Sequence, residues 1–457
     1  MLSVKELVIV SKGILLNGDE KYIPTDYVID SRNINNKAFF VPIKGERVDG
    51  QNYIIDAVNC GICGYFITRD CKNKKYIIDE TIKINKDIII IEVDDAKEAL
   101  YNSGKYNRIK HIDIPVVAVT GSVGKTSTRE MIASVLATEK KVLVTNANYN
   151  SLIGAPLMAL KIDNQDICVL EIGTDCKGEI EKLSELLVPD IGVITMIGTA
   201  HIGNFGSREN IYKEKIQICS HMKEKSTLIV NGDDDFLVKL HSNELINVEK
   251  FKKKDISNLE ENINGIKFNT NIYGKDEEII INQIGIHNVQ NAICAIRVAE
   301  KFNIKKENII NGIKKYKNFS RRLEKIELEN NIVLIDDTYN ASIDSMKSGL
   351  KTVNKINSKR KIAVLGDMLE LGEFSDKIHS DVGKIFGNLK YDILYVIGSK
   401  SKLIAKEAKK FLYVKEFNDI DKLIFDLKNE IKSGDLIYLK ASNSMKFNKI
   451  VNSLKAK

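Results

Sequence analysis

The sequence predicts an α/β protein with three domains: a small N-terminal α/β domain, a central domain with a mainly parallel sheet of the P-loop ATPase type, and a C-terminal Rossmann-like α/β domain. Two observations support this class. Apolar, β-branched runs alternate with longer amphipathic segments along most of the chain, which is typical of parallel sheets covered by helices. The chain has 457 residues, about three times a common domain size.

The expected domains are residues 1–113, 114–318 and 319–457. Pro115 precedes the strand-like run VVAV, and the segment before it reads as a helix and a connection, so the first boundary falls near residue 113. The second boundary falls near Phe319, where a helical run and a lysine-rich stretch give way to a new series of strands.

The composition excludes several classes of protein. Lys and Arg number 69 and Asp and Glu 62, so the net charge of +7 is modest for this length, and no nucleic-acid partner is expected. No apolar run is long enough for a membrane span, and the N-terminus lacks the pattern of a signal peptide. Seven cysteines spread along the chain indicate reduced thiols and a cytoplasmic protein. Cys60, Cys63 and Cys71 lack a fourth ligand at matching spacing for zinc.

Polar clusters follow the predicted strands. In the central region the apolar runs lead into TGSVGKTS, NANYN, EIGTD, MIGTAH and NGDDD, and in the last region into DDTYN, GDMLELGE, GSKS and KASNS. Open α/β sheets bind ligands beyond the carboxyl ends of their strands, so these clusters mark candidate sites. Two such sheets facing each other predict a cleft between the second and third domains.

The segment TGSVGKTST at 120–128 follows a buried-type strand and precedes a helical run. Gly121 and Gly124 let backbone N–H groups approach phosphate oxygens, and the start of the helix adds a favourable dipole. Lys125 is expected to neutralise the β- and γ-phosphates, and Thr126 has the hydroxyl position that holds Mg²⁺ in such loops. The general phosphate-loop motif has a glycine where this chain has Val119. The alternative interpretation is therefore a glycine-rich turn with an exposed lysine.

With its shortened glycine spacing, this loop resembles the nucleotide loop of the Mur ligases, ATP-dependent enzymes that extend the peptide of a cell-wall precursor. The resemblance covers nearly the whole chain, because further motifs occur in the same order: DSR, FVPIKGERVDG, NYNSLIGAP, LEIG, IGTAH, GIHNVQNA, RRLE, IDDTYNA and LGDMLELGEFS. It implies transfer of the γ-phosphoryl group of ATP to a substrate carboxylate, followed by attack of an amine on the acyl-phosphate. The implied substrates are a UDP-muramoyl peptide and a D-amino-acid dipeptide or another amine.

The resemblance also implies roles for particular residues, with an ATP site that is complete only when the third domain closes on the second. The implied catalytic residues are Lys125, Lys215 and His201. The implied ATP- and phosphate-binding residues are Gly121, Ser122, Val123, Gly124, Lys125, Thr126, Ser127, Asn288, Asn291, Arg322 and Asp337. The implied UDP-substrate residues are Ser31, Arg32, Lys44, Gly45, Asp49, Asn148 and Asn150, and the implied amine-substrate residues are Asp336, Tyr339 and Asn340. The implied ligands of one or two Mg²⁺ ions are Thr126, Glu171 and His201.

Some of these residues also have simpler interpretations. A lone histidine such as His201 is usually a surface or core residue. Lys215 falls where the family carries a carbamylated lysine, which would need a lowered pKa because CO₂ adds only to a neutral amine. The simpler interpretation is a solvated helix lysine, and Gln217 replaces a glutamate common in the family. The segment KGERVDG reads equally well as a plain turn.

The chain departs from the family pattern mainly around the acceptor peptide and the amine. Ser342 and Ile343 replace Asn-Pro, Ala441 and Asn443 replace the glycine and arginine of KGSR, and Gly203 replaces a glutamate. The lost arginine matters most, because asparagine cannot replace the charge of a guanidinium. Two alternatives stay open. The first is a Mur-type ligase that joins another carboxylate and amine. The second is a non-ligating nucleotide switch, which is expected to carry a guanine-reading NKxD sequence that the chain lacks. A monomer is expected.

Overall fold

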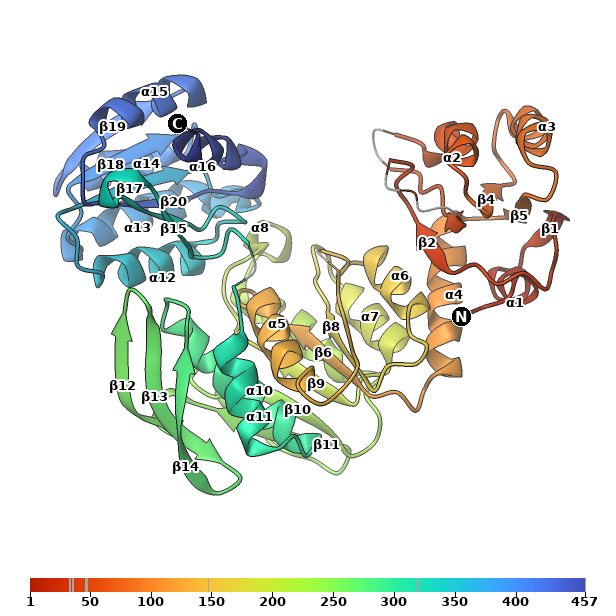
Figure 1. Ribbon diagram of the computed structural model, residues 1–457, viewed down its shortest axis with the longest axis horizontal. Coiled ribbons are helices and arrows are strands. Elements are labelled where there is room, and N and C mark those ends of the chain that lie inside the picture. Colours follow the sequence, from red (N-terminus) through yellow and green to blue (C-terminus); the bar gives the residue numbers. More distant parts are fainter. Residues whose placement is uncertain (33, 35–36, 46–47, 147, 319, 457) are drawn as a thin grey trace.

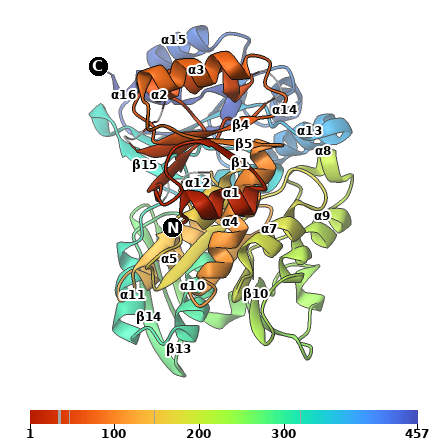
Figure 2. The same ribbon diagram turned by 90° about the vertical axis from the view of Figure 1, so that its right-hand side faces the viewer.

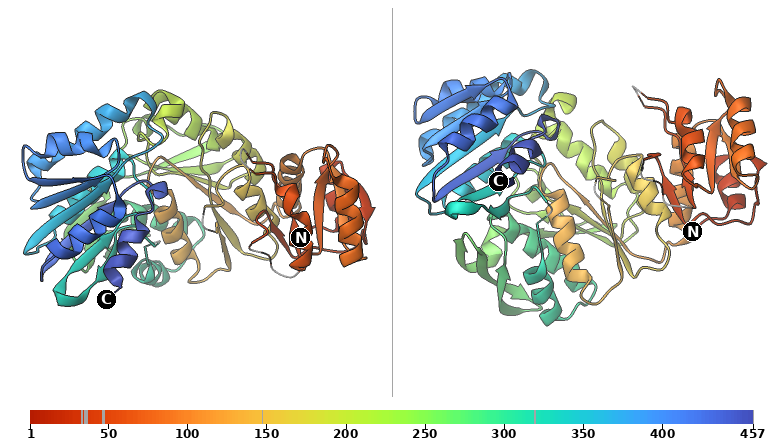
Figure 3. Two further views of the ribbon diagram at one scale, coloured as in Figure 1. Left: turned by 90° about the horizontal axis from the view of Figure 1, so that it is seen from above. Right: turned by 45° about the horizontal axis from the view of Figure 1, so that its top comes forward.

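The computed structural model describes residues 1–457 except 33, 35–36, 46–47, 147, 319 and 457. The described residues form sheets in three successive regions, and the N-terminal and C-terminal regions lie at opposite ends of the molecule (Figures 1 and 3). The predicted α/β class is confirmed. The domain boundaries stay predictions, and Phe319 lies outside the described residues. No helix in the described part of the chain is long and apolar enough to cross a membrane.

The N-terminal region holds a sheet in the order β1-β5-β4-β3-β2, in which β1 is antiparallel and the other strands are parallel. Helices α2 and α3 cover one face and α1 and α4 the other (Figure 2), so the central strands are apolar on both sides. The strands are β1 (Ile14–Asn17), β2 (Asp26–Val28), β3 (Ala38–Phe40), β4 (Gly64–Thr68) and β5 (Ile89–Val93). The helices are α1 (Val4–Ser11), α2 (Ile54–Asn59), α3 (Lys74–Ile84) and α4 (Ala96–Lys110).

The middle region holds a parallel sheet in the order β11-β10-β9-β6-β8-β7. The strands are β6 (Val116–Thr120), β7 (Val142–Val144), β8 (Ile167–Glu171), β9 (Ile191–Ile194), β10 (Ser226–Asn231) and β11 (Ile246–Phe251). The helices are α5 (Lys125–Leu136), α6 (Gly154–Leu160), α7 (Glu179–Leu187), α8 (Ile202–Phe205), α9 (Arg208–Lys215), α10 (His287–Lys301) and α11 (Lys306–Lys315). The predicted strands before the polar clusters are therefore present, and α5 starts directly after the glycine-rich loop.

A separate antiparallel sheet, β12 (Ile256–Asn262), β13 (Gly265–Ile272) and β14 (Lys275–Ile281), precedes α10 and was not expected from the sequence. The central strand, β13, alternates buried and more exposed side chains over most of its length, which is the pattern of a sheet with one solvated face. The apolar face, with Ile266, Phe268 and Ile279, joins the core formed by α10 and α5.

The C-terminal region holds a sheet in the order β15-β16-β20-β17-β18-β19, parallel except for β15. The strands are β15 (Glu324–Glu327), β16 (Val333–Asp336), β17 (Arg360–Gly366), β18 (Ile393–Ile397), β19 (Tyr413–Phe417) and β20 (Asp435–Lys440). The helices are α12 (Ile343–Asn354), α13 (Ser375–Ile385), α14 (Ser401–Ala408), α15 (Ile420–Glu430) and α16 (Asn448–Lys455).

A buried arginine joins the first two regions. Arg108, near the end of α4, has no exposed surface and donates to the carbonyl oxygens of Leu187 at 2.6 Å and Val188 at 3.2 Å, where α7 ends. It also donates to the carbonyls of His111 and Ile114, at 2.7 and 2.9 Å. Because these carbonyls satisfy a charge that would otherwise be costly to bury, α4 is held firmly against the middle region.

Candidate active site

The glycine-rich loop after β6 is held against the end of β9. Gly121 and Gly124 have φ angles of 145° and 90°, which side chains rarely adopt, and a Cβ on Gly121 would lie 1.9 Å from the Oγ1 of Thr195. The Thr195 hydroxyl donates to the carbonyl of Val123 at 2.6 Å, and the Ser122 N–H donates to the carbonyl of Met196 at 2.9 Å. The loop is therefore fixed before any ligand binds.

This loop keeps polar groups available for a ligand. The buried Oγ of Ser122 has no hydrogen-bond partner among the described residues, although buried hydroxyls normally have one. Lys125 Nζ donates to the carbonyl of Gly121 at 2.8 Å, and burial is the main cause that lowers the pKa of this lysine. The arrangement fits phosphate oxygens, which would supply the missing partners at the start of α5. Lys125 is partly buried, which differs from the exposed lysine of the alternative interpretation.

Arg322 reaches this loop from the C-terminal region. Its Nη2 donates to the Oγ1 of Thr126 at 3.1 Å, and its guanidinium lies 4.2 Å from the centre of the Tyr339 ring. Its Nε is buried and has no partner among the described residues. The structure therefore brings together Lys125, Thr126 and Arg322, three of the residues predicted to surround the phosphates.

Glu171, a predicted metal ligand at the end of β8, is almost fully buried. Its Oε1 accepts from Asn150 Nδ2 at 2.8 Å, and its Oε2 accepts from Arg129 Nη1 at 3.2 Å. Arg129 was missed by sequence reasoning, since an arginine within α5 carries no sign that it points inward. Both carboxylate oxygens of Glu171 thus have protein partners, and its negative charge is balanced near Lys125.

His201 is also a predicted metal ligand, and it lies in the loop after β9. Its side chain faces two carboxylates. Its Nδ1 lies 2.8 Å from Glu370 Oε2 and 3.2 Å from Asp175 Oδ1. The contact with His201 lowers the pKa of Glu370. Among the residues that the structure describes, no three His, Cys, Asp or Glu side chains form a metal cluster. Mg²⁺ often binds through one or two carboxylates together with substrate phosphates, so the oxygen donors near the loop fit an ion shared with ATP.

Lys215, at the end of α9, is 3% exposed, so it is not a solvated helix lysine. Burial, and after it the charge of Lys125, lower its pKa to about 7. Its neighbour Glu214 is also buried and accepts from the N–H groups of Gly178 at 2.7 Å and Ile180 at 2.9 Å. The structure therefore holds an amine that is partly neutral near pH 7 and that interacts electrostatically with Lys125 of the phosphate loop.

Asn288 and Asn291 lie within α10 and are buried against α5. Asn288 Nδ2 donates to the carbonyl of Ile284 at 2.9 Å, and Asn291 Oδ1 accepts from the hydroxyl of Thr128 at 2.8 Å. The two asparagines therefore pack against the helix that follows the phosphate loop. Their side-chain amides already form hydrogen bonds within the protein.

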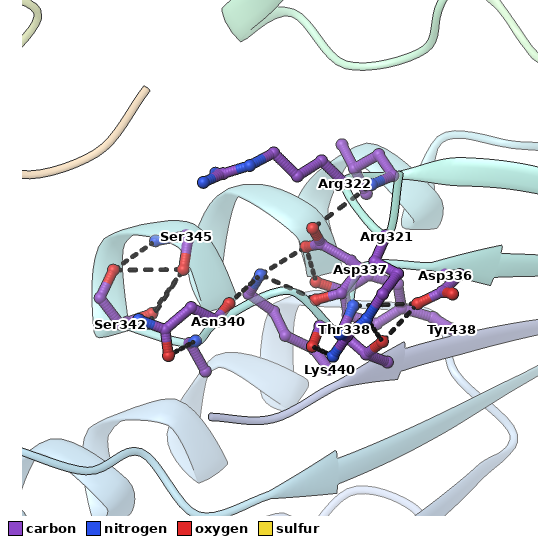
Figure 4. Close-up of polar contacts among 12 residues, drawn as sticks. Arg321, Arg322, Asp336, Asp337, Thr338, Asn340, Ser342, Ser345, Tyr438 and Lys440 are labelled. Atoms are coloured by element: carbon purple, nitrogen blue, oxygen red, sulfur yellow. Dashed lines mark hydrogen bonds and ion pairs between the residues drawn. The ribbon is translucent and has the colours of Figure 1, made fainter. Parts of the chain in front are cut away.

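Asp337 and Asp336, at the end of β16, are both buried (Figure 4). Asp337 Oδ2 accepts from Lys440 Nζ at 2.6 Å and from the Tyr438 hydroxyl at 2.9 Å. Asp336 Oδ1 accepts from the Thr338 N–H at 3.0 Å and hydroxyl at 2.6 Å, and burial raises its pKa. These carboxylates fix the loop that follows.

Tyr339 and Asn340 belong to that loop and lie closer to solvent. Lys440 Nζ also donates to the carbonyl of Asn340 at 3.1 Å. Tyr339 therefore lies next to Arg322, and the buried Lys440 holds the loop through its hydrogen bond to Asn340.

Two further contacts dock the middle and C-terminal regions. Asp344 Oδ2 accepts from the N–H of Thr199 at 3.1 Å and from its hydroxyl at 3.2 Å. The N–H of Gly203 donates to the carbonyl of Glu370 at 3.3 Å, and a Cβ on Gly203 would lie 2.7 Å from the nitrogen of Gly372. Glycine in place of the family's glutamate therefore permits close backbone contact. Sequence reasoning missed Thr199, Asp344 and Glu370, although each lies in or beside a motif that it had singled out.

The predicted UDP-substrate residues lie in two regions, five of them in the N-terminal region and two in the middle region. Lys44 and Asp49 pair as a bridge, Asp49 caps the helical turn that follows by accepting from the N–H of Gln51 at 3.0 Å, and Gly45 lies within the same turn. Ser31 and Arg32 follow β2, where Arg32 is exposed and bonds to Asp30 at 2.7 Å.

Asn148 and Asn150 lie instead in the middle region. The intervening Tyr149 packs against the cores of both the N-terminal and the middle regions. The structure does not bring these asparagines into the turn at Lys44; it brings Asn150 to Glu171, at the junction between the two regions.

The fold and the site together define a nucleotide-binding α/β enzyme whose phosphate loop is completed by an arginine from another region. Family comparisons agree: the Mur ligase middle domain matches residues 119–299, and the Mur ligase glutamate ligase domain matches residues 321–443. The UDP-N-acetylmuramoyl-tripeptide–D-alanyl-D-alanine ligase of Bacillus subtilis is 34% identical, covering 99% of this chain and 98% of the relative. The chain therefore belongs to the Mur ligase family.

Solved structures show the same similarity. The crystal structure of MurF from Acinetobacter baumannii has a TM-score of 0.85 and 27% identity, covering 100% of this chain and 99% of that one. MurF from Thermotoga maritima in complex with ADP has a TM-score of 0.79 and 25% identity, covering 94% and 97%. The predicted family and three-domain fold are thus confirmed.

Proposed function

We propose that the chain is an ATP-dependent ligase that joins D-alanyl-D-alanine to UDP-N-acetylmuramoyl-tripeptide in peptidoglycan precursor synthesis. The main observation behind the proposal is the hydrogen bond from Arg322 of the C-terminal region to Thr126 of the phosphate loop. This contact completes a preformed loop with a residue from another region. Similarity along the whole chain to ligases of that name gives the substrates.

In the proposed reaction, the loop N–H groups and Lys125 bind the phosphates, and Arg322 adds positive charge when the C-terminal region is docked. Bound Mg²⁺ would neutralise and orient the phosphate oxygens. The γ-phosphoryl group passes to the terminal carboxylate of the tripeptide, giving an acyl-phosphate. The amine then attacks the carbonyl carbon, and the tetrahedral intermediate expels phosphate. Thr126 and Glu171 would hold the Mg²⁺ that ATP carries, and His201 would help to hold a second ion.

The substrates are assigned to the two sides of this loop. The turn with Lys44, Gly45 and Asp49, together with Ser31 and Arg32, would bind the UDP end. Asn148 and Asn150, at the junction, would face the peptide that extends toward the phosphate loop. On the other side, the loop after β16 with Tyr339 and Asn340 would hold the amine, and Asp336 and Asp337 fix that loop in place.

Lys215 is proposed to carry a carbamate. Its pKa of about 7 leaves the amine substantially neutral, and a neutral amine adds CO₂ with release of one proton. The product is an anion, which is attracted to Lys125 where the protonated amine was repelled. A carbamate signal after incubation with ¹³C-bicarbonate, lost in Lys215→Met, would support the modification. No signal in the unchanged protein would refute it.

The enzyme is proposed to act in the cytoplasm, in agreement with seven free cysteines, and as a monomer. Phosphate release measured over a panel of amine acceptors tests the substrate assignment. We expect turnover only when ATP, UDP-muramoyl-tripeptide and D-alanyl-D-alanine are all present. Turnover with a different amine would instead favour a Mur-type ligase for another acid and amine, and nucleotide-dependent binding without any ligation product would favour a switch protein.

A further inference from the structure

Arg321, the residue before Arg322, has a guanidinium group that is fixed in place by neutral acceptors. Its Nε donates to the hydroxyl of Thr338 at 3.0 Å, and its Nη2 donates to the carbonyl of Thr338 at 2.5 Å and to the Oδ1 of Asn443 at 3.2 Å. The backbone is also constrained: φ is 66°, and the Arg321 N–H donates to Glu324 Oε2 at 2.9 Å. The side chain is therefore held in one orientation before any substrate arrives.

The charge of this guanidinium is not balanced by an ion pair. Among the described residues, none forms an ion pair with Arg321, and the hydrogen bonds of its guanidinium involve Nε and Nη2 but not Nη1. Asp336 is close enough for Arg321 to lower its pKa slightly, but its Oδ1 is bonded to Thr338. A partly exposed arginine with a fixed orientation and an unused nitrogen is suited to bind an anion, because little further side-chain entropy is lost on binding.

The position of Arg321 separates it from the phosphates. Figure 4 shows the two arginine side chains diverging, with Arg322 extended along the top of the view and Arg321 turned toward Thr338. Arg322 contacts the phosphate loop through Thr126, whereas Arg321 contacts Thr338 and Asn443, which lie after β16 and β20 of the C-terminal region. The N–H of Tyr339 donates to the carbonyl of Arg321 at 3.0 Å, so Arg321 belongs to the same surface as the proposed amine site.

We propose that Arg321 binds the free carboxylate of the incoming amine substrate and so selects amino acids or dipeptides over simple amines. Asn443 would orient the guanidinium rather than bind substrate. This proposal rests on the proposed function, because it assumes that the loop after β16 holds the amine. It also offers a physical reason why asparagine is tolerated at 443: the positive charge is supplied by the neighbouring Arg321.

The test compares D-alanyl-D-alanine with its C-terminal amide as acceptors, in the unchanged protein and in Arg321→Gln and Arg321→Lys. The unchanged protein should prefer the free acid. In Arg321→Gln the KM for the acid should rise about 10- to 100-fold, as expected for loss of a charge-assisted hydrogen bond, with the KM for the amide and for ATP nearly unchanged. Arg321→Lys should recover part of the preference, and Arg297→Gln, at an arginine paired with Glu300 on α10, serves as the control.

The outcomes separate the two proposals. An acid-to-amide preference that is retained in Arg321→Gln would overturn the role of Arg321 alone, as would a rise confined to the KM for ATP. No turnover of D-alanyl-D-alanine by the unchanged protein would overturn the proposed function and this role together. Thermal unfolding of each variant shows whether a loss of activity comes from a loss of folding.

Discussion

Gly203 tests how the middle and C-terminal regions meet. Its φ lies outside the left-handed range, so alanine carries no conformational penalty, and only the available space matters. An added Cβ would lie 2.7 Å from the nitrogen of Gly372, 2.9 Å from the carbonyl oxygen of Glu370 and 3.0 Å from the carbonyl carbon of Leu371. These are backbone atoms that cannot rotate away, and overpacking of this kind costs about 1–3 kcal/mol.

The protein can relieve this strain by separating the two regions, which would also withdraw Arg322 from Thr126. A cost of about 1–3 kcal/mol lowers the ratio of docked to undocked protein about 5- to 150-fold, and we expect the kcat/KM for phosphate release to fall by up to this factor in Gly203→Ala. The thermal unfolding temperature should change little, because the apolar cluster around α5 and α10 and the cluster around α16 each lie within one region and stay intact. Gly387→Ala is the control, since the three atoms nearest to its added Cβ, from 3.0 Å outward, all belong to the side chain of Phe411, which can move. A kcat/KM within twofold of the unchanged protein would refute the reasoning.

Three further predictions concern single side chains. Lys125→Ala should reduce acyl-phosphate formation to background without a change in unfolding temperature, because among the described residues the ammonium bonds only to the carbonyl of Gly121; retained activity would remove Lys125 from the mechanism. For Lys215 the pKa falls from 10.5 to about 7 on folding, so the unfolded chain binds more protons between these values, and stability rises with pH across this window. In CO₂-free buffer, Lys215→Met should therefore be more stable than the unchanged protein by a few kcal/mol at pH 7 and about equal near pH 10.5 in urea unfolding; no gain at pH 7 would contradict the burial argument. Asp344→Asn should lower kcat/KM about tenfold, because Thr199 loses a charged acceptor, whereas Asp421→Asn, at an exposed pair with Lys449, should have no effect; equal kinetics for both would exclude the Asp344 contact from docking.

Local sequence was a good guide to the strands and to the phosphate loop. Runs such as VVAV and IVLI are apolar without alternation because both faces of their strands are covered by helices, and the polar residues that follow reach the carboxyl edge of the sheet. Gly121 and Gly124 could be predicted because only glycine readily adopts the backbone angles of the loop.

Contacts between distant segments could not be predicted in the same way. Asp344 and Thr199 are 145 residues apart, and neither residue type indicates its partner. Arg108 and Arg129 read as solvated helix residues, since arginine is rarely buried without a partner and the partners are backbone carbonyls or a distant carboxylate. The burial of Lys215 was also invisible, because it depends on how α9 packs against the middle region.

The most direct test of the proposed function is phosphate release from ATP, measured with UDP-N-acetylmuramoyl-tripeptide and D-alanyl-D-alanine added separately and together. The account predicts release above background only with both substrates, accompanied by the ligated pentapeptide product in mass spectrometry. Background release with both substrates present, by folded protein that binds ATP, would contradict it.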